Sequence, residues 1–449
     1  MQSVVESLGP GTYNAPMLST TPRQSLPFIA RTLMPREIWA NGTMAVALGA
    51  LEGGVVGVLV KNEFESVAPT AWVNLAVALV AGAPAFANMA SLTISGLAEG
   101  RDKTAWVSRL MVLTSIALIA MAFMPYTLAG LVGLTMAVVL ARLAWAGVIT
   151  LRAAIWRANF PRHVRAQITG RITVIYSMII AFTAAALGSV MSIWPESWRW
   201  MFPICGVLGL IAALRYQRMR IRMGARLRRS EQAQRLQRQG GQFRAAFGIL
   251  RTDVWFRRYM LTMFAFGSGN LMVIALLIII LSDQFGFAKL SQMLITTSLP
   301  LIGVAVFTPI WARRLDATHI LDYRARQAWS FVLAIGLFAL ATILSQPWLF
   351  WAGAVALGAA FAGGKLGWNL GHNDFASDEQ STLYMGIHVT LTGIRGLIAP
   401  LTGVMVYQWL ETLGDGFGRW VLLFPFALTL GAAVTFVILA RLRRQLVSA

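Results

Sequence analysis

Long apolar stretches alternate with short polar connections along this chain, and the apolar stretches recur twelve times. A helix needs about 20 residues to cross a hydrocarbon core about 30 Å thick, and each stretch has about that length. Because a spanning segment must satisfy its own backbone polar groups, we expect an all-α membrane protein. The pattern predicts spans at residues 37–60, 70–97, 105–125, 128–152, 170–193, 199–216, 257–281, 290–312, 327–345, 348–371, 382–409 and 419–440.

An Arg-rich segment divides the predicted spans into two sets of six. Arg31-Thr32 precedes the first span and Arg251-Thr252 precedes the seventh, which indicates a repeat. Matching span number and loop polarity favour two parallel six-helix halves. The sequence therefore predicts a tail over residues 1–34, an N-terminal half over 35–216, a basic linker over 217–252 and a C-terminal half over 253–445.

The distribution of basic residues predicts the topology. The chain is 57% hydrophobic and 12% charged, with a formal net charge of +20. If the N-terminus is cytoplasmic, the basic residues left on the outer side are Lys61, Arg199, Lys289 and Arg419. Cytoplasmic loops carry an excess of Lys and Arg, so the charge indicates topology and not a nucleic-acid partner. We expect a multi-pass protein of a bacterial-type inner (plasma) membrane with both termini in the cytoplasm.

The linker region is strongly basic. From Arg215 to Arg258 it contains 13 arginines and two acids, Glu231 and Asp253. It could contact anionic membrane lipids, since each basic residue near such a surface contributes about 1 kcal/mol. It could equally be a solvated linker that fixes the topology. The sequence leaves both interpretations open.

Charged side chains at membrane depth are the strongest functional signal, because each costs at least about 2.5 to 3.5 kcal/mol there. Glu52 lies in the middle of the first predicted span and Arg142 in the middle of the fourth. Among apolar neighbours, Glu52 could bind a coupling proton, pair with Arg142 or contact substrate alone. Arg142 could bind a carboxylate or phosphate bidentately, or form an internal salt bridge.

Two polar stripes lie on the tenth and eleventh predicted spans and suggest a polar path that opens to the cytoplasm. Their members are Lys365, Asn369 and His372 on the tenth span and Tyr384, His388, Thr392 and Arg395 on the eleventh. Lys365 could bind substrate or snorkel to the nearby membrane surface. His388 could relay protons or be a hydrogen-bonded imidazole, and Asn270 on the seventh span could contact substrate or another helix. We expect no metal site, because no compact ligand spacing occurs.

The connection after the second span reads Gly96-Leu97-Ala98-Glu99-Gly100-Arg101-Asp102-Lys103. With the twelve-span pattern, it resembles the signature of the major facilitator superfamily of secondary transporters. Gly96 and Arg101 match in place, and Asp102 lies two residues after the acid position. The second half retains Arg314 and Asp316 at the equivalent connection. The resemblance implies gating roles for these five residues. It also implies that helices 1, 4, 7 and 10 line a central cavity, while helices 3, 6, 9 and 12 face lipid.

These observations predict a secondary transporter that works by alternating access on a small organic solute, and they leave open whether it is coupled to protons. Arg142, Lys365, Arg395 and Glu52 together carry a charge of +2, which favours an anionic or zwitterionic solute. An exporter of amphipathic compounds and a non-transporting assembly factor on the same fold are alternatives. The chain has no phosphate-binding loop or nucleophile elbow, so neither an enzyme nor a cofactor is expected.

Overall fold

The computed structural model describes residues 28–237, 248–376 and 380–448, so most of the predicted tail lies outside the described residues. Within these ranges, twelve helical segments are long and apolar enough to cross a membrane, which confirms the predicted number of spans. The N-terminal half, here called the N-half, contains α1 (Phe28–Ala50), α2 (Gly53–Phe64), α3 (Thr70–Phe86), α4 (Ala90–Ala98), α5 (Lys103–Met121), α6 (Leu128–Asn159), α7 (Arg162–Ile193) and α8 (Trp198–Gln217).

The linker contributes α9 (Gly224–Gln237). The C-terminal half, here called the C-half, contains α11 (Val254–Asp283), α12 (Lys289–Met293), α13 (Leu299–Asp316), α14 (Ile320–Ile343), α15 (Trp348–Leu370), α16 (Ser381–Leu413) and α17 (Leu423–Ser448). Several helices begin at a side-chain cap that satisfies a free amide. The Thr127 hydroxyl accepts from Gly130 N at 3.2 Å, and the Asp253 carboxylate accepts from Phe256 N at 2.8 Å.

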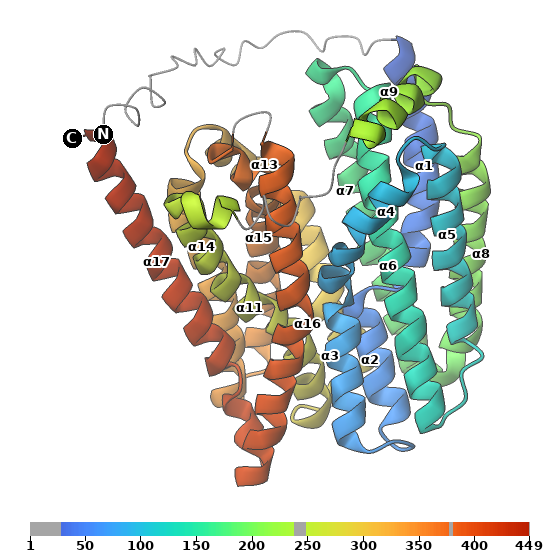
Figure 1. The fold of residues 1–449 in the computed structure, drawn as a ribbon. Coiled ribbons are helices and arrows are strands. Elements are labelled where there is room, and N and C mark those ends of the chain that lie inside the picture. Colours follow the sequence, from blue (N-terminus) through green and yellow to red (C-terminus); the bar gives the residue numbers. More distant parts are fainter. Residues whose placement is uncertain (1–27, 238–247, 377–379, 449) are drawn as a thin grey trace.

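The two halves are bundles that lie side by side (Figure 1). The end of the molecule that carries α9, the start of α1 and the end of α17 is called the linker face, and the opposite end, with connections 65–69 and 284–288, the far face. The halves pack through α3 against α16, α7 against α12 and α13, and α2 against α11. Spans 3, 6, 9 and 12, which are α5, α8, α14 and α17, lie at the outer sides and expose apolar side chains, as the resemblance implies.

The first span is not a continuous helix, although its hydrophobic pattern predicts one. Helix α1 ends at Ala50 and α2 begins at Gly53, while Glu52 between them has extended backbone with φ −61° and ψ 139°. In a continuous helix the amide of Val55 would donate to Leu51 O. It donates instead to Glu52 O at 2.9 Å, so the Leu51 carbonyl is available to a partner from another helix.

The eighth span also departs from a regular helix. Between α12 and α13, residues Leu294–Ser298 form one turn of π-helix. Such turns are rare and occur frequently at functional sites. This π-turn packs against the start of α2, where Gly54 faces Thr296 and Thr297. The break in span 1 and the π-turn in span 8 therefore meet at the contact between the two halves.

Gly54→Ala is expected to weaken this contact. An alanine Cβ would collide with Thr297 Oγ1 and would lie 2.6 Å from Thr296 Oγ1, so the threonine side chains would have to turn or the helices would have to separate. Overpacking of this kind costs about 1 to 3 kcal/mol, and we expect the apparent Tm of the purified protein to fall by several degrees. Gly57→Ala is the matched control, because the one close contact of its Cβ would be the flexible end of Ile278 at 2.5 Å, with Val77 at an ordinary 3.6 Å. Equal losses of Tm in both variants would contradict this account.

Candidate functional site

The break in span 1 is held by Arg142 of α6. Arg142 Nη2 donates to the Leu51 carbonyl at 2.5 Å and to Glu52 Oε2 at 2.8 Å. One guanidinium thus satisfies the carbonyl that the break releases and pairs with the acid at the break. The Arg142 side chain is 6% exposed and that of Glu52 is 29% exposed. The structure therefore forms the ion pair that the sequence left open, and it leaves the Glu52 side chain partly exposed halfway through the span.

Lys365 of α15 supplies a second positive charge from the other half. Its side chain is exposed, and its ammonium interacts electrostatically with Glu52. Within the part of the chain that the structure describes, Lys365 Nζ has no hydrogen-bond or ion-pair partner. Asn369, one turn nearer the linker face, is also exposed and donates to the Lys365 carbonyl at 2.9 Å. Each half thus contributes an ionisable side chain with exposed surface, and the two interact electrostatically.

An aromatic pair lies beside Arg142 and was not predicted as part of the site. Tyr176 of α7 stacks on Trp145 of α6, with ring centroids 6.5 Å apart and planes 5° apart. Tyr176 interacts electrostatically with Glu52 and Arg142, so its hydroxyl lies near the ion pair. The sequence placed Trp145 near the face of Arg142, but nothing in the pattern of α7 indicated Tyr176.

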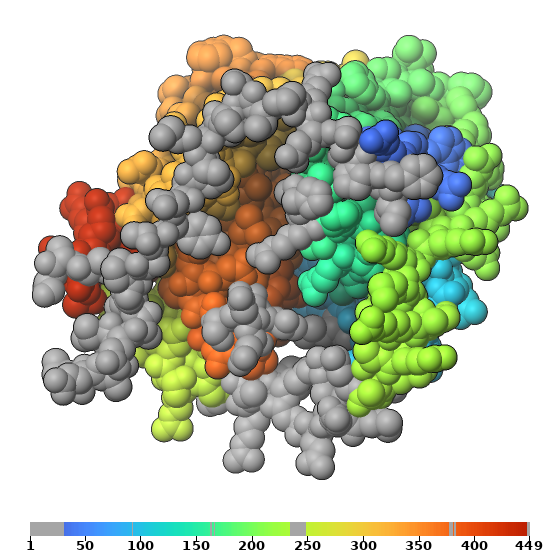
Figure 2. Space-filling model, turned by 90° about the horizontal axis from the view of Figure 1, so that it is seen from above, coloured from blue at the N-terminus to red at the C-terminus, as the bar shows by residue number. Residues whose placement is uncertain are grey.

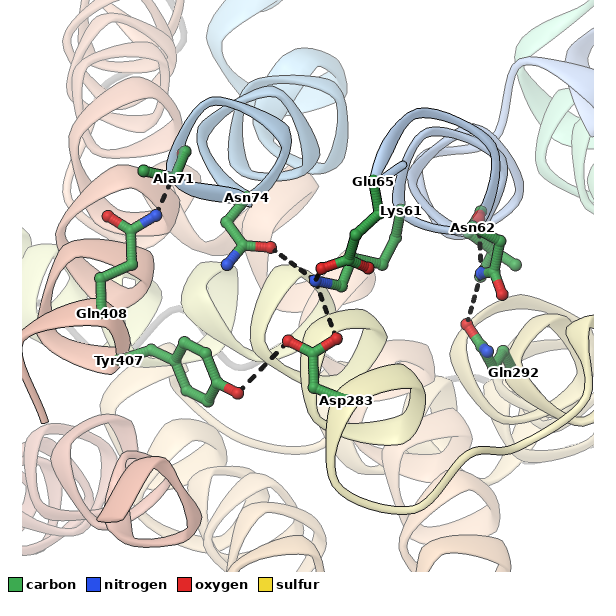
Figure 3. A network of polar contacts seen from close by, with 10 residues as sticks. Lys61, Asn62, Glu65, Ala71, Asn74, Asp283, Gln292, Tyr407 and Gln408 are labelled. Atoms are coloured by element: carbon green, nitrogen blue, oxygen red, sulfur yellow. Dashed lines mark hydrogen bonds and ion pairs between the residues drawn. The ribbon is translucent and has the colours of Figure 1, made fainter. Parts of the chain in front are cut away.

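On the far face, Lys61 of α2 forms the centre of a polar network between the halves (Figure 3). Its ammonium is fully buried and contacts Asp283 of α11 at 2.8 Å, Glu65 at 2.6 Å and Asn74 of α3 at 3.1 Å. Asp283 also accepts from Tyr407 OH at 3.4 Å. The sequence analysis treated Lys61 as a topological charge and did not single out Asp283, so this cross-half pair was missed.

Further polar contacts join the halves near the same face. Asn62 donates to Gln292 at 3.3 Å, and Gln408 donates to the Ala71 carbonyl at 3.0 Å. Lys289 pairs with Glu63. The polar contacts that the structure describes between the halves lie at this face or at the level of the π-turn, where Ser298 donates to the Ala181 carbonyl at 2.8 Å. Polar contacts therefore join the halves at the far face, and the described residues form none between the halves at the linker face, which Figure 2 shows from above.

Arg395 and His388 of α16 do not join this site. Arg395 is 4% exposed; it donates to the Met263 carbonyl of α11 and to Thr392 Oγ1 at 3.1 Å, and its guanidinium packs on Gly267. His388 is fully buried against Trp368, with ring centroids 5.4 Å apart. Both side chains thus lie inside the C-half. Their helical stripe matched a cavity face in sequence, but the face packs against other helices of the same bundle.

Asn270 lies on α11 and is partly exposed. Its amide oxygen is buried and has no hydrogen-bond partner among the described residues. The structure brings it into no contact with Arg142 or Lys365. Its predicted role in substrate binding therefore stays a prediction.

Part of the predicted gating signature contacts α9 of the linker. Gly100, which has a left-handed φ of 73°, donates its amide to Glu231 at 3.0 Å, and Lys103 pairs with the same carboxylate at 2.6 Å. Asp102 caps α5; partial burial raises its pKa, but hydrogen bonds from Thr104 and Ala105 outweigh this, so the pKa lies below its ordinary value. Its carboxylate also lies 3.7 Å from Arg228 of α9.

The other predicted gating residues make fewer contacts. Gly96 is exposed on α4, with no atom within 4 Å of where its Cβ would lie. Arg101 and Arg314 lie over Trp106 and Trp311 at 5.8 and 5.3 Å. Asp316, the last residue of α13, is exposed.

Glu231→Gln should loosen the connection between α4 and α5. The variant loses the charge that holds Lys103 and the Gly100 amide, and hydrogen bonds to charged groups contribute about 1.5 to 3 kcal/mol. We expect faster amide hydrogen exchange over residues 99–103. Arg229→Gln, on the exposed side of α9, should leave this exchange unchanged. Unchanged exchange in Glu231→Gln would show that α9 does not hold the connection.

Glu37, a buried acid in the N-half, was also missed by the sequence analysis. Glu37 of α1 is fully buried, accepts from Asn41 at 2.8 Å and from Tyr216 OH of α8 at 3.2 Å, and interacts electrostatically with Arg152 of α6. Glu37 is the first residue of the predicted span, a position at which charged residues are common. It joins α1, α6 and α8 near the linker face.

The comparisons with known proteins agree with this architecture. The model of the Major Facilitator Superfamily matches residues 42–320. A mutant of the nucleoside transporter NupG has a TM-score of 0.68 at 14% identity, with 91% of this chain and 99% of that chain covered. The xylose transporter XylE from E. coli, in an inward open conformation, has a TM-score of 0.67 at 13% identity over 91% and 96% of the chains. The POT family transporter PepTSo has a TM-score of 0.69 at 10% identity over 92% and 98%. A comparison with curated proteins finds no match.

Two six-helix bundles with charged groups between them, halfway through the spans, define a secondary transporter of the multi-pass membrane class. The chain belongs to the Major Facilitator Superfamily, whose model matches more than half of it.

Proposed function

We propose that this protein moves a small anionic or zwitterionic organic solute across the membrane by alternating access, with Arg142 and Lys365 as the anion-binding groups. The observation that carries this proposal is the ion pair of Arg142 with the partly exposed Glu52 in one half, together with the exposed Lys365 of the other half, which interacts electrostatically with the same acid. A carboxylate or phosphate that reached these groups would meet an ammonium with no other partner and the edge of a guanidinium, which binds such groups bidentately. Because the cations belong to different halves, the solute would hold the halves together.

Glu52 is the proposed proton-coupling residue. Its carboxylate competes with any anionic solute for the Nη2 group of Arg142. When a proton neutralises Glu52, this competition ends and one guanidinium edge becomes available to the solute. Proton and anion would then bind together, which predicts tighter solute binding at lower pH. His388 is excluded from this proposal because it is buried inside the C-half.

The linker face is assigned to the cytoplasm on the basis of its arginines, following the positive-inside rule. In this assignment the conformation is closed to the outside and open to the inside. The protein would lie in a bacterial-type inner membrane, and protons and the solute would be its small-molecule partners.

Ligand-induced thermal stabilisation tests the anion site. Purified protein is screened with carboxylates, phosphates, amino acids, sugars and nucleosides at two pH values. We expect a carboxylate- or phosphate-bearing compound to raise the apparent Tm of wild type, more strongly at the lower pH. Lys365→Met should weaken this binding about tenfold or more, since a hydrogen bond to a charged group contributes about 1.5 to 3 kcal/mol.

The matched control for Lys365→Met is Arg313→Met. Arg313 is exposed near the end of α13 and carries the same charge from the same half, but it forms no described contact with the N-half. This variant should leave the solute affinity at a given pH close to that of wild type. The anion proposal would be abandoned if only sugars or nucleosides stabilised the protein, or if both variants lost the same affinity.

A further inference from the structure

A cavity of about 490 Å³ lies near the linker face between the start of α1 and the end of α8, away from the proposed transport site. It is lined by Pro35, Arg36, Trp39, Ala40, Arg215, Arg218 and Met219. The guanidinium of Arg215 on α8 lies over the Trp39 ring of α1 at 4.3 Å, so the two helices that line the cavity are in contact at this pair. In the view onto the linker face, the blue start of α1 lies beside the light green end of α8 (Figure 2).

The cavity carries three positive charges with no acid in its lining. Arg36, Arg215 and Arg218 are exposed, and in the described ranges none of them forms an ion pair. The neighbouring acid, Glu37, points inward to Asn41 and Tyr216. Guanidinium groups bind phosphate through parallel hydrogen bonds, so three of them in one concave site favour a phosphate group.

The two helices that line this cavity, α1 and α8, are joined by a buried hydrogen bond on the side away from the cavity. Arg36 and Glu37 are adjacent on α1, and Arg215 and Tyr216 are adjacent on α8. The outward members of these pairs line the cavity, while the inward members join the two helices through the 3.2 Å hydrogen bond from Tyr216 OH to Glu37. Both inward side chains are buried. The spacing between the arginines of α1 and α8 is therefore set by the packed interior and does not depend on the ligand.

The surface around the cavity is that of a lipid site. Toward the middle of α8 the exposed side chains are apolar, with Ile204 53%, Val207 49%, Ile211 40% and Leu214 61% exposed. The next residue, Arg215, begins the basic cluster. Trp39, which is 41% exposed, has the amphipathic ring that is enriched at the boundary between hydrocarbon and headgroups. An acyl chain could lie along α8 while its headgroup enters the cavity.

We propose that this cavity binds the headgroup of an anionic phospholipid, with Arg36, Arg215 and Arg218 on the phosphate and Trp39 at the glycerol level. The chain's own preceding segment is a poor occupant, because residues 1–27 contain one acid, Glu6, and also the basic Arg23. The lipid would join α1 to α8 from outside, as the Glu37–Tyr216 contact does from inside. It would thereby stabilise the N-half at α1, the helix that ends just before Glu52.

The test measures the apparent Tm of delipidated protein in detergent after addition of phosphatidylglycerol, phosphatidylcholine with the same chains, or inorganic phosphate. We expect phosphatidylglycerol to raise the Tm by about 3 °C or more, and the other two additives to have little effect. The triple variant Arg36→Gln, Arg215→Gln, Arg218→Gln should lose this rise. Native mass spectrometry should show one fewer tightly bound phosphatidylglycerol in the same variant.

The matched control is Arg222→Gln, Arg226→Gln, Arg229→Gln, which removes the same charge from exposed positions at and beside α9. It should retain the full rise in Tm. The single variants Arg215→Gln and Arg218→Gln, which disturb the helix end less, should each lose part of the rise. The proposal is overturned if phosphatidylcholine stabilises as well as phosphatidylglycerol, if inorganic phosphate alone reproduces the effect, or if the control triple loses as much as the cavity triple.

Discussion

Arg142→Ala should abolish solute uptake and also destabilise the protein. The variant removes the proposed anion ligand and leaves both the Leu51 carbonyl and Glu52 without their partner at the break in span 1. Loss of two charge-assisted hydrogen bonds predicts at least about a 100-fold fall in uptake. The loss of stability should be about 1 to 3 kcal/mol, below the range for fully buried pairs because Glu52 is partly exposed. Uptake into proteoliposomes and the apparent Tm measure the two effects.

Two further substitutions separate binding from coupling. Arg142→Lys keeps the positive charge but loses the planar guanidinium that can form two parallel hydrogen bonds. It should therefore lose less stability than solute uptake. Glu52→Gln mimics the protonated acid and should bind solute with an affinity that no longer changes with pH. Wild-type uptake in Arg142→Ala would refute the assignment of this residue. A normal pH dependence in Glu52→Gln would place the coupling proton elsewhere.

Asp283→Asn should shift the protein toward the conformation that is open at the far face. Lys61 is fully buried and reaches across the halves only through Asp283 among its contacts in Figure 3. Breaking a buried ion pair typically costs about 3 to 5 kcal/mol. A cavity of about 550 Å³, lined by Asp283, Tyr407 and Glu411, reaches the carboxylate and reduces this cost. Even about 1.4 kcal/mol would change the ratio of the two conformations tenfold.

Glu65→Gln is the matched control, because Glu65 contacts the same ammonium at 2.6 Å from within the N-half. It should change the conformational ratio far less than Asp283→Asn. Distances between spin labels placed on the far-face ends of α2 and α11 measure the ratio, after Cys205 is replaced by serine; Cys205 is the chain's single cysteine. Equal shifts in the two variants would show that the cross-half pair does not control closure.

The sequence predicted the twelve spans and the two halves, because lipid imposes one strong and regular constraint on the hydrophobic pattern. It also selected Glu52, Arg142 and Lys365, since charge at membrane depth is rare for energetic reasons. It did not predict the break at Glu52 or the π-turn at Leu294–Ser298. Both depend on contacts with other helices, and the local composition of the spans is apolar enough for continuous helices.

Helical stripes specify less about the position of a side chain. A polar stripe shows that one face of a helix contacts polar groups or water. It does not show whether that face lies between the two halves or inside its own bundle. Arg395, on the stripe of α16, points into the interior of the C-half. Lys365, on the stripe of α15, interacts electrostatically with Glu52 of the N-half. Lys61 and Asp283 lie at the ends of their spans, where charges are common. Only the three-dimensional contact makes them a pair.

Transport of a defined solute mixture tests the central claim most directly. Proteoliposomes containing wild type, Arg142→Ala or no protein are exposed to equal concentrations of carboxylates, phosphorylated metabolites, amino acids, sugars and nucleosides, with and without an inward proton gradient. Mass spectrometry then identifies what enters. We predict that wild type accumulates at least one carboxylate- or phosphate-bearing solute, that the proton gradient increases its accumulation, and that Arg142→Ala vesicles match the empty ones. Entry of uncharged solutes alone, or equal entry into wild-type and Arg142→Ala vesicles, would contradict the account.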